Sequence, residues 1–182
     1  MPVTARAPKK RDYPQHPPGL FSAVCCDVVD LGMQENKFKA GKMQHKVRIV
    51  WQTEEIYTDP TGEFPPARYT PSGWYTLSLH EKATLRQHLE AWRGRAFTEE
   101  ELDGFDLEKL IGVNCQLSIV ANTVEGKTYS NVNAIVQTAK GAPKISVVDY
   151  VRVKDREGYI APINPLGPLE AETEANDGDV PF

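Results

Sequence analysis

Cysteine is scarce in this sequence of 182 residues, which contains only Cys25, Cys26 and Cys115. The three residues lack the short paired spacing of a zinc site, and an odd number does not suit a disulfide framework. Their scarcity excludes a small domain that is held together by metal ions or disulfides. We expect all three thiols to be reduced, with Cys25 and Cys26 on opposite faces of a strand.

Long hydrophobic runs are absent as well. No segment approaches the ~20 apolar residues that a membrane-spanning helix needs, and the first residues lack the apolar stretch of a secretory signal. We therefore expect a cytoplasmic protein without a membrane partner. Hydrophobic residues make up 40% of the chain, which suits a folded core rather than a disordered chain.

The familiar motifs of catalysis are also missing. No phosphate-binding glycine loop or nucleophile elbow occurs, and His80-Glu81 is not followed by a second histidine at metal-binding spacing. One dense group of carboxylates suits a metal-dependent nuclease, and it consists of Glu99, Glu100, Glu101, Asp103 and Asp106. Acidic residues are also favoured at the positive end of a helix dipole. The group can therefore be explained by helix stability alone, without a metal. We expect no enzyme activity, metal or cofactor.

Basic residues are absent from residues 165–182, although this segment carries five acidic residues. All 21 Lys and Arg residues and the other 20 acidic residues precede Pro165, so residues 1–164 have a net charge near +1. The acidic segment cannot bury enough apolar surface to fold alone. We therefore predict a disordered acidic tail at residues 165–182.

Alternation of polar and apolar residues predicts five strands, at residues 20–31, 44–54, 74–80, 113–122 and 129–138. In the second strand, Val47, Ile49 and Trp51 share one face, which we assign to the core. In the last strand, we place Val132, Ala134 and Val136 on the inner face. The proline-rich residues 56–73 are predicted to form a loop.

Helical spacing interrupts the strands between residues 81 and 112. Leu85, Leu89 and Trp92 recur at helical intervals, and Gly94 follows as a plausible stop. Thr98 precedes three glutamates and is predicted to cap a short helix. Another helical turn is expected at residues 105–111.

The resulting order is three strands, a helical segment and two strands, which is the order of elements in an OB-fold barrel. We predict a mainly β protein with one five-stranded OB-fold domain at residues 19–138 and the helical insertion between strands 3 and 4. Residues 1–18 form a flexible basic arm or a disordered leader. In the extension at residues 139–164, the segment 145–153 either adds a strand or packs across the barrel.

The end of the acidic tail has the composition of a protein-docking segment. The Phe182 ring can fill an apolar pocket, and Pro181 limits the entropy lost on binding. The docking residues are Asp177, Asp179, Val180, Pro181 and Phe182. This tip resembles the acidic C-terminal tip of bacterial single-stranded DNA-binding proteins, which ends in Ile-Pro-Phe. The resemblance implies a partner among replication and recombination proteins, such as a polymerase, helicase, primase or nuclease.

A second resemblance lies in the domain. Residues 106–112, the turn at 126–129 and residues 131–135 are similar to bacteriophage single-stranded DNA-binding proteins with an OB-fold. The resemblance implies a protein of phage DNA replication, recombination and repair that coats single strands in the cytoplasm of a bacterial host.

A nonspecific site for single strands needs clustered cations and exposed aromatic rings, because every base can stack. OB-folds bind strands across their second and third strands and the adjoining loops. The residues that meet these requirements are Lys37, Phe38, Lys39, Lys42, Lys46, Arg48, Tyr57, Arg68, Tyr69, Trp74, Lys127 and Tyr129. The loop lysines could equally be solvated charges, and Trp74 could close the end of the barrel. Trp51 and Trp92 are assigned to the core.

Two other functions stay open. An OB-fold adaptor would recruit replication proteins through the tail and contact DNA weakly, which suits the near-neutral charge of residues 1–164. A metal-dependent nuclease would use the carboxylates at residues 99–106. Oligomeric state and the length of DNA bound are not indicated by any motif.

Overall fold

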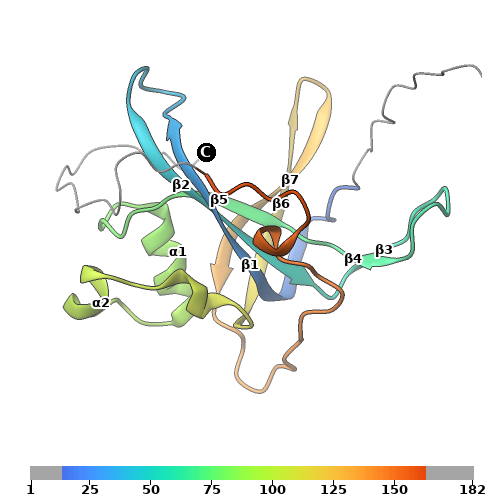
Figure 1. Cartoon of the computed structure of the whole chain (residues 1–182). Coiled ribbons are helices and arrows are strands. Elements are labelled where there is room, and N and C mark those ends of the chain that lie inside the picture. Colours follow the sequence, from blue (N-terminus) through green and yellow to red (C-terminus); the bar gives the residue numbers. More distant parts are fainter. Residues whose placement is uncertain (1–13, 163–182) are drawn as a thin grey trace, which may run out of the picture.

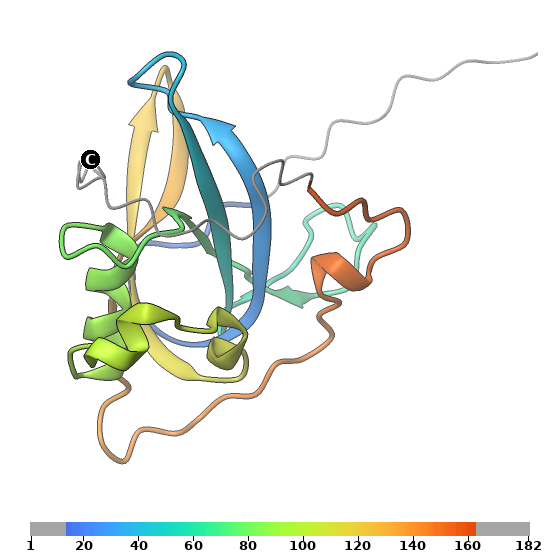
Figure 2. The ribbon, with the colours of Figure 1, turned by 60° about the vertical axis from the view of Figure 1, so that its left-hand side comes forward.

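A computed structural model describes residues 14–162 and consists mainly of β structure (Figures 1 and 2). Five strands form one antiparallel sheet in the order β5-β2-β1-β6-β7. They are β1 (Gly19–Glu35), β2 (Met43–Thr53), β5 (Ser72–Thr76), β6 (Asn114–Val124) and β7 (Lys127–Val136). The predicted mainly β class is thus confirmed. The predicted acidic tail and most of the basic arm lie outside the described residues.

The inner face of the sheet carries the core. Val47, Ile49 and Trp51 of β2 are buried, as their alternation predicts. Cys115, Leu117 and Ile119 of β6 complete the same face, and the three cysteines are free thiols. Burial raises the pKa of the Cys26 thiol to about 12, so this group is protonated at neutral pH.

β-Bulges in β1 and β7 change which side chains face inward. In β1, Cys26 is an extra residue between paired positions, so Cys26 and Asp27 both lie on the outer face, while Cys25 lies in the core. In β7, the bulge at Asn133 reverses the alternation. Ile135 is therefore buried and Val136 is exposed, which makes the inward assignment of Ala134 and Val136 wrong.

The helices follow β5 in the sequence and cover one end of the sheet (Figure 1). Helix α1 (Thr84–Arg93) buries Leu85, Leu89 and Trp92, as predicted, and ends at Gly94 in the left-handed conformation. The Trp92 Nε1 group donates a hydrogen bond to the Asn114 carbonyl at 2.9 Å, which joins α1 to β6. Within residues 14–162, no helix is long and apolar enough to cross a membrane.

Two short helical segments follow α1. Helix α2 (Glu99–Asp103) begins with a capping box, in which the Thr98 hydroxyl accepts a hydrogen bond from the Glu101 amide and the Glu101 carboxylate accepts one from the Thr98 amide. The 3₁₀ helix η1 (Leu107–Leu110) is capped by Asp106. Both helical predictions are confirmed, and two of the clustered acidic residues serve as caps.

The segment predicted as a loop at residues 56–73 contains a two-stranded ribbon, β3 (Ile56–Tyr57) and β4 (Ala67–Arg68). Proline interrupts ladders because it lacks an amide hydrogen. Here Pro60, Pro65 and Pro66 lie between the two strands and leave the ladder intact.

The extension adds no strand to the sheet in residues 137–162, and packs across its outer face instead. We call residues 145–155 the strap; it ends in the 3₁₀ helix η2 (Val153–Asp155). Strap residues Val147, Tyr150 and Val153 cover a second apolar cluster, formed by Cys26, Val29 and Val50. The strap is drawn in orange and red in Figures 1 and 2.

The capping box provides a test of the local fold. Replacing Thr98 with Ala should lower the free energy of unfolding by about 1 kcal/mol, because the Glu101 amide loses its acceptor. Urea unfolding followed by circular dichroism measures the change. Thr98→Ser keeps the hydroxyl and should remain close to the natural protein; equal losses in both variants would show that the cap bond does not stabilise α2.

Candidate nucleic-acid interface

The outer face of β2 and β5 presents a cation beside an aromatic ring. Arg48 and Trp74 are cross-strand neighbours, and the Arg48 guanidinium lies 5.9 Å from the centroid of the Trp74 ring. Trp74 is 59% exposed, so most of its side chain faces solvent rather than the core. Two pairs further along, on the same face, Lys46 Nζ donates a hydrogen bond to Thr76 Oγ1 at 2.6 Å. This surface can offer a stacking face and positive charge together.

The hairpin that joins β1 to β2 continues this surface. The Asn36 side chain accepts a hydrogen bond from the Phe38 amide at 2.8 Å, and the Asn36 amide donates to the Lys42 carbonyl at 2.7 Å. These bonds fix the turn, and Phe38 is 69% exposed at its tip. Lys37 and Lys39 flank the ring in the sequence and are exposed.

The β6–β7 hairpin projects from the same end of the molecule, away from the helices (Figures 1 and 2). Glu125 and Gly126 turn the chain with positive φ angles of 49° and 77°. Lys127 follows the turn and Tyr129 is 45% exposed. These two predicted residues therefore lie on a different hairpin from Phe38.

Three other predicted residues lie on the β3–β4 side of the molecule, beyond the far end of β2. The Tyr57 and Tyr69 ring centroids are 6.0 Å apart. Arg68 Nη1 donates a hydrogen bond to the Ser146 carbonyl, in the strap, at 2.8 Å. We call Tyr57, Arg68 and Tyr69 the far group. The near group consists of Lys37, Phe38, Lys39, Lys42, Lys46, Arg48 and Trp74.

The strap is held over the outer face by a buried carboxylate, Asp27, which is 1% exposed. Asp27 accepts hydrogen bonds from Arg152 Nε at 3.0 Å, the Val153 amide at 2.7 Å and the Tyr150 hydroxyl at 3.2 Å. Arg152 also donates two bonds to Glu108, at 2.7 and 2.8 Å, and these lower the pKa of the Glu108 carboxyl. No sequence pattern indicates these contacts, because their partners are 44–126 positions apart.

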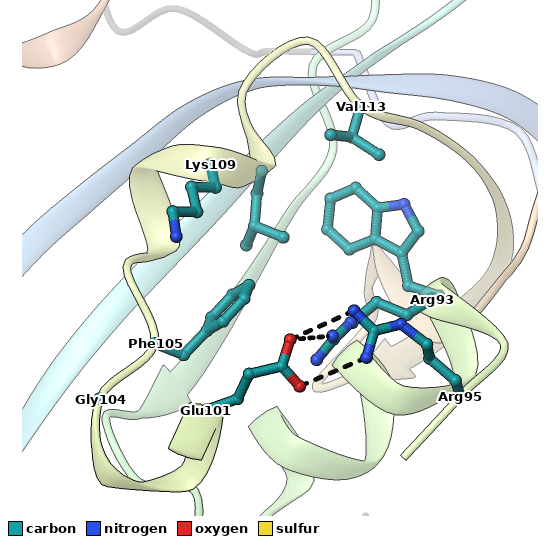
Figure 3. A pocket seen from close by; sticks show the side chains of 9 residues that line it. Arg93, Arg95, Glu101, Gly104, Phe105, Lys109 and Val113 are labelled. Atoms are coloured by element: carbon teal, nitrogen blue, oxygen red, sulfur yellow. Dashed lines mark hydrogen bonds and ion pairs between the residues drawn. The ribbon is translucent and has the colours of Figure 1, made fainter. Parts of the chain in front are cut away.

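A pocket of about 340 Å³ lies among the helical segments, with Trp92 and Phe105 among the residues that line it (Figure 3). Arg93 and Arg95 both bind the Glu101 carboxylate there. The Thr98 amide and the two arginines lower the pKa of Glu101 to about 2. Glu101 thus offsets part of the positive charge of the two arginines inside the pocket.

The carboxylates at residues 99–106 do not form a metal centre. Among residues 14–162, no group of three or more His, Cys, Asp or Glu side chains is arranged to hold a metal ion. Glu101 and Asp106 cap helical segments instead. The structure therefore gives the nuclease alternative no support.

Comparison with known proteins adds no identification. No family model matches the sequence, and no curated protein is similar enough to count as a relative.

The Glu101 carboxyl predicts how stability depends on pH. Its pKa lies near 2 in the folded protein and near 4.5 when unperturbed, so its ionised form stabilises the fold above about pH 4.5. This stabilisation is lost as the pH falls towards 2. Glu101→Gln should therefore destabilise the protein at pH 7, and its deficit should shrink on acidification, as measured by urea unfolding at several pH values. Glu100→Gln, on the exposed side of the same turn, is the control; a deficit that is constant with pH would contradict the prediction.

Proposed function

We propose that this protein binds single-stranded DNA without sequence preference, through the near group and the tip of the β6–β7 hairpin. The observation that carries the proposal is the exposed Trp74 ring beside the Arg48 guanidinium, on one face with Lys46. Bases of any identity can stack on such a ring, while neighbouring cations attract the phosphates. Phe38 offers a second exposed ring, at the tip of the β1–β2 hairpin that also carries Lys46 and Arg48.

An OB-fold barrel is the architecture that we propose for the sheet. In that fold, the first three strands form a meander, and the last two strands continue from strand 1. The order β5-β2-β1-β6-β7 supports this assignment, with β5 as the third strand. The edge strands β5 and β7 approach each other, and α1 lies beside both of them. Trp74 then lies on the third strand, in the region where OB-folds bind their ligands.

A role in phage DNA replication and recombination follows from the resemblances in the sequence. We infer that the acidic segment, which lies outside the described residues, recruits replication or recombination enzymes. Asp177 and Asp179 would meet basic residues of such a partner, and Val180, Pro181 and Phe182 would fill an apolar pocket. The protein would act in the cytoplasm of a bacterial host.

An adaptor with weak DNA contact is the second candidate, and the net charge near +1 of residues 1–164 favours it. The two candidates differ in affinity for single strands. A gel shift with a single-stranded oligonucleotide and its duplex, at equal salt, separates them. Binding to the single strand alone supports the proposed function, and binding to neither supports the adaptor.

Removing the exposed rings should weaken binding. Phe38→Ala and Trp74→Ala should each reduce the affinity for an oligo(dT) by about 5- to 150-fold, because each stacked base contributes ~1–3 kcal/mol. Fluorescence anisotropy of a labelled oligonucleotide measures the loss. Leu20→Ala is the matched control, since Leu20 is a large apolar side chain that is 62% exposed outside the near group. Unchanged affinity in both ring variants would remove these residues from the site.

The cations of β2 should contribute to DNA affinity by binding phosphates, so their contribution should depend on the salt concentration. Replacing Lys46 and Arg48 together with Gln should reduce the slope of log affinity against log salt by about 1.4, which is ~0.7 for each lost phosphate contact on a single strand. Anisotropy titrations at several salt concentrations measure this slope. Lys140→Gln and Lys144→Gln together remove two exposed charges from the extension and should leave the slope unchanged. An equal slope in all three proteins would rule out phosphate contacts at β2.

A further inference from the structure

The strap divides the outer face of β2 into an open half and a covered half. The outward side chains of this strand are, in order, Lys46, Arg48, Val50 and Gln52. The first two are only half-buried, whereas Val50 is 5% exposed and Gln52 is 3% exposed. The row that begins with the near group therefore runs directly under the strap.

The sheet holds the strap by its backbone, as a receptor holds an extended peptide. The Gln52 side chain donates to the Val148 carbonyl at 2.6 Å and accepts from the Val148 amide at 2.9 Å. Asn114 makes the same pair of bonds to Ile145, at 3.1 and 2.8 Å. Such contacts can be broken and re-formed without unfolding the sheet, because the sheet's own ladders do not involve the strap.

The covered half of the face leads to Arg68. The Arg68 guanidinium is engaged by the Ser146 carbonyl while the strap is in place. Tyr69 belongs to the segment that follows β4, and its carbonyl accepts a hydrogen bond from the Thr53 amide at the end of β2. The Tyr57 and Tyr69 rings lie on the other side of the β3–β4 ribbon, where Tyr69 contacts His16. Displacement of the strap would therefore release Arg68 and the Gln52 amide, but not the two rings.

The acid under the strap favours the closed form. Asp27 is paired with Arg152 while the strap is in place, and uncovering it would present an unpaired carboxylate to the phosphates. Opening of the strap therefore favours DNA binding only when the new contacts of the DNA with Arg68 and Gln52 contribute more binding free energy than the repulsion by Asp27 costs.

We propose that the strap sets the length of single-stranded DNA that one chain holds. With the strap closed, the path of the nucleic acid ends at Arg48 and Trp74; when the strap is displaced, the path continues over Val50 and Gln52 to Arg68. This inference rests on the proposed function and assigns the strap as a positioning element of that site.

Asp27→Asn tests the proposal, because it weakens the attachment of the strap and removes the repelling charge at once. Cys26 reports whether the strap has opened, since it is 2% exposed beneath Tyr150 and Val153. Its reaction with a thiol reagent should become at least about tenfold faster in the variant. Cys25 lies in the inner core and should stay protected, which excludes global unfolding.

The DNA measurement uses full-length protein and an oligo(dT) series. An OB-fold holds about 4–16 nucleotides, so the natural protein should reach full affinity within this range. The Asp27→Asn variant should need an oligonucleotide that is a few nucleotides longer to do so. Asp149→Asn is the matched control, because Asp149 is an exposed strap residue whose positive φ of 49° suits Asn.

Each outcome decides one question. A reactive Cys26 with an unchanged length requirement would overturn the proposal. Tyr150→Ala, which removes an apolar contact as well as a bond to Asp27, provides a second opening variant; protection of Cys26 in both variants would also overturn it, because the strap would not be displaceable. Absence of binding by the natural protein at every length would instead refute the proposed function, while the Cys26 reaction would still report the movement of the strap.

Discussion

Alternation along β2 is the constraint on which the rest of the molecule depends. Successive side chains of a strand point to opposite faces, so β2 supplies apolar side chains to the core and a different set of side chains to the outer face. Val47, Ile49 and Trp51 fill the core, while Lys46 and Arg48 reach the outer face. A slip of one residue in the pairing with β1 would bury the cations and expose Trp51. The core therefore fixes the position of the proposed interface.

The outer face is unusual because part of it is a second core. The strap covers Cys26, Val29 and Val50, and it brings Arg152 onto Asp27. Removing Arg152 would leave the buried Asp27 carboxylate without its counter-charge, and a loss of this kind typically costs about 3–5 kcal/mol. The bulge at Cys26 makes this arrangement possible, since it places Cys26 and Asp27 on the same face. The bulge and the strap thus form one structural unit, although they are more than 100 residues apart.

The surface that remains open has the features expected for nonspecific recognition of single strands. Trp74 and Phe38 stand out from the sheet and from the hairpin tip, and the cations near them come from the same hairpin. The pocket between the helices differs, because Glu101 binds both of its arginines.

The sequence alone determined the parts of the structure that depend on neighbours in the chain. The alternation of β2, the helical spacing of Leu85 and Leu89 and the cap at Thr98 were all predicted, because each pattern records a local geometry. Tertiary structure decided which face Ile135 lies on, where the strap lies, and how the predicted DNA contacts divide among the near group, the far group and the β6–β7 hairpin. These features depend on bulges and on hydrogen bonds between distant residues, such as Gln52 with Val148, and no periodic pattern in a single sequence encodes them.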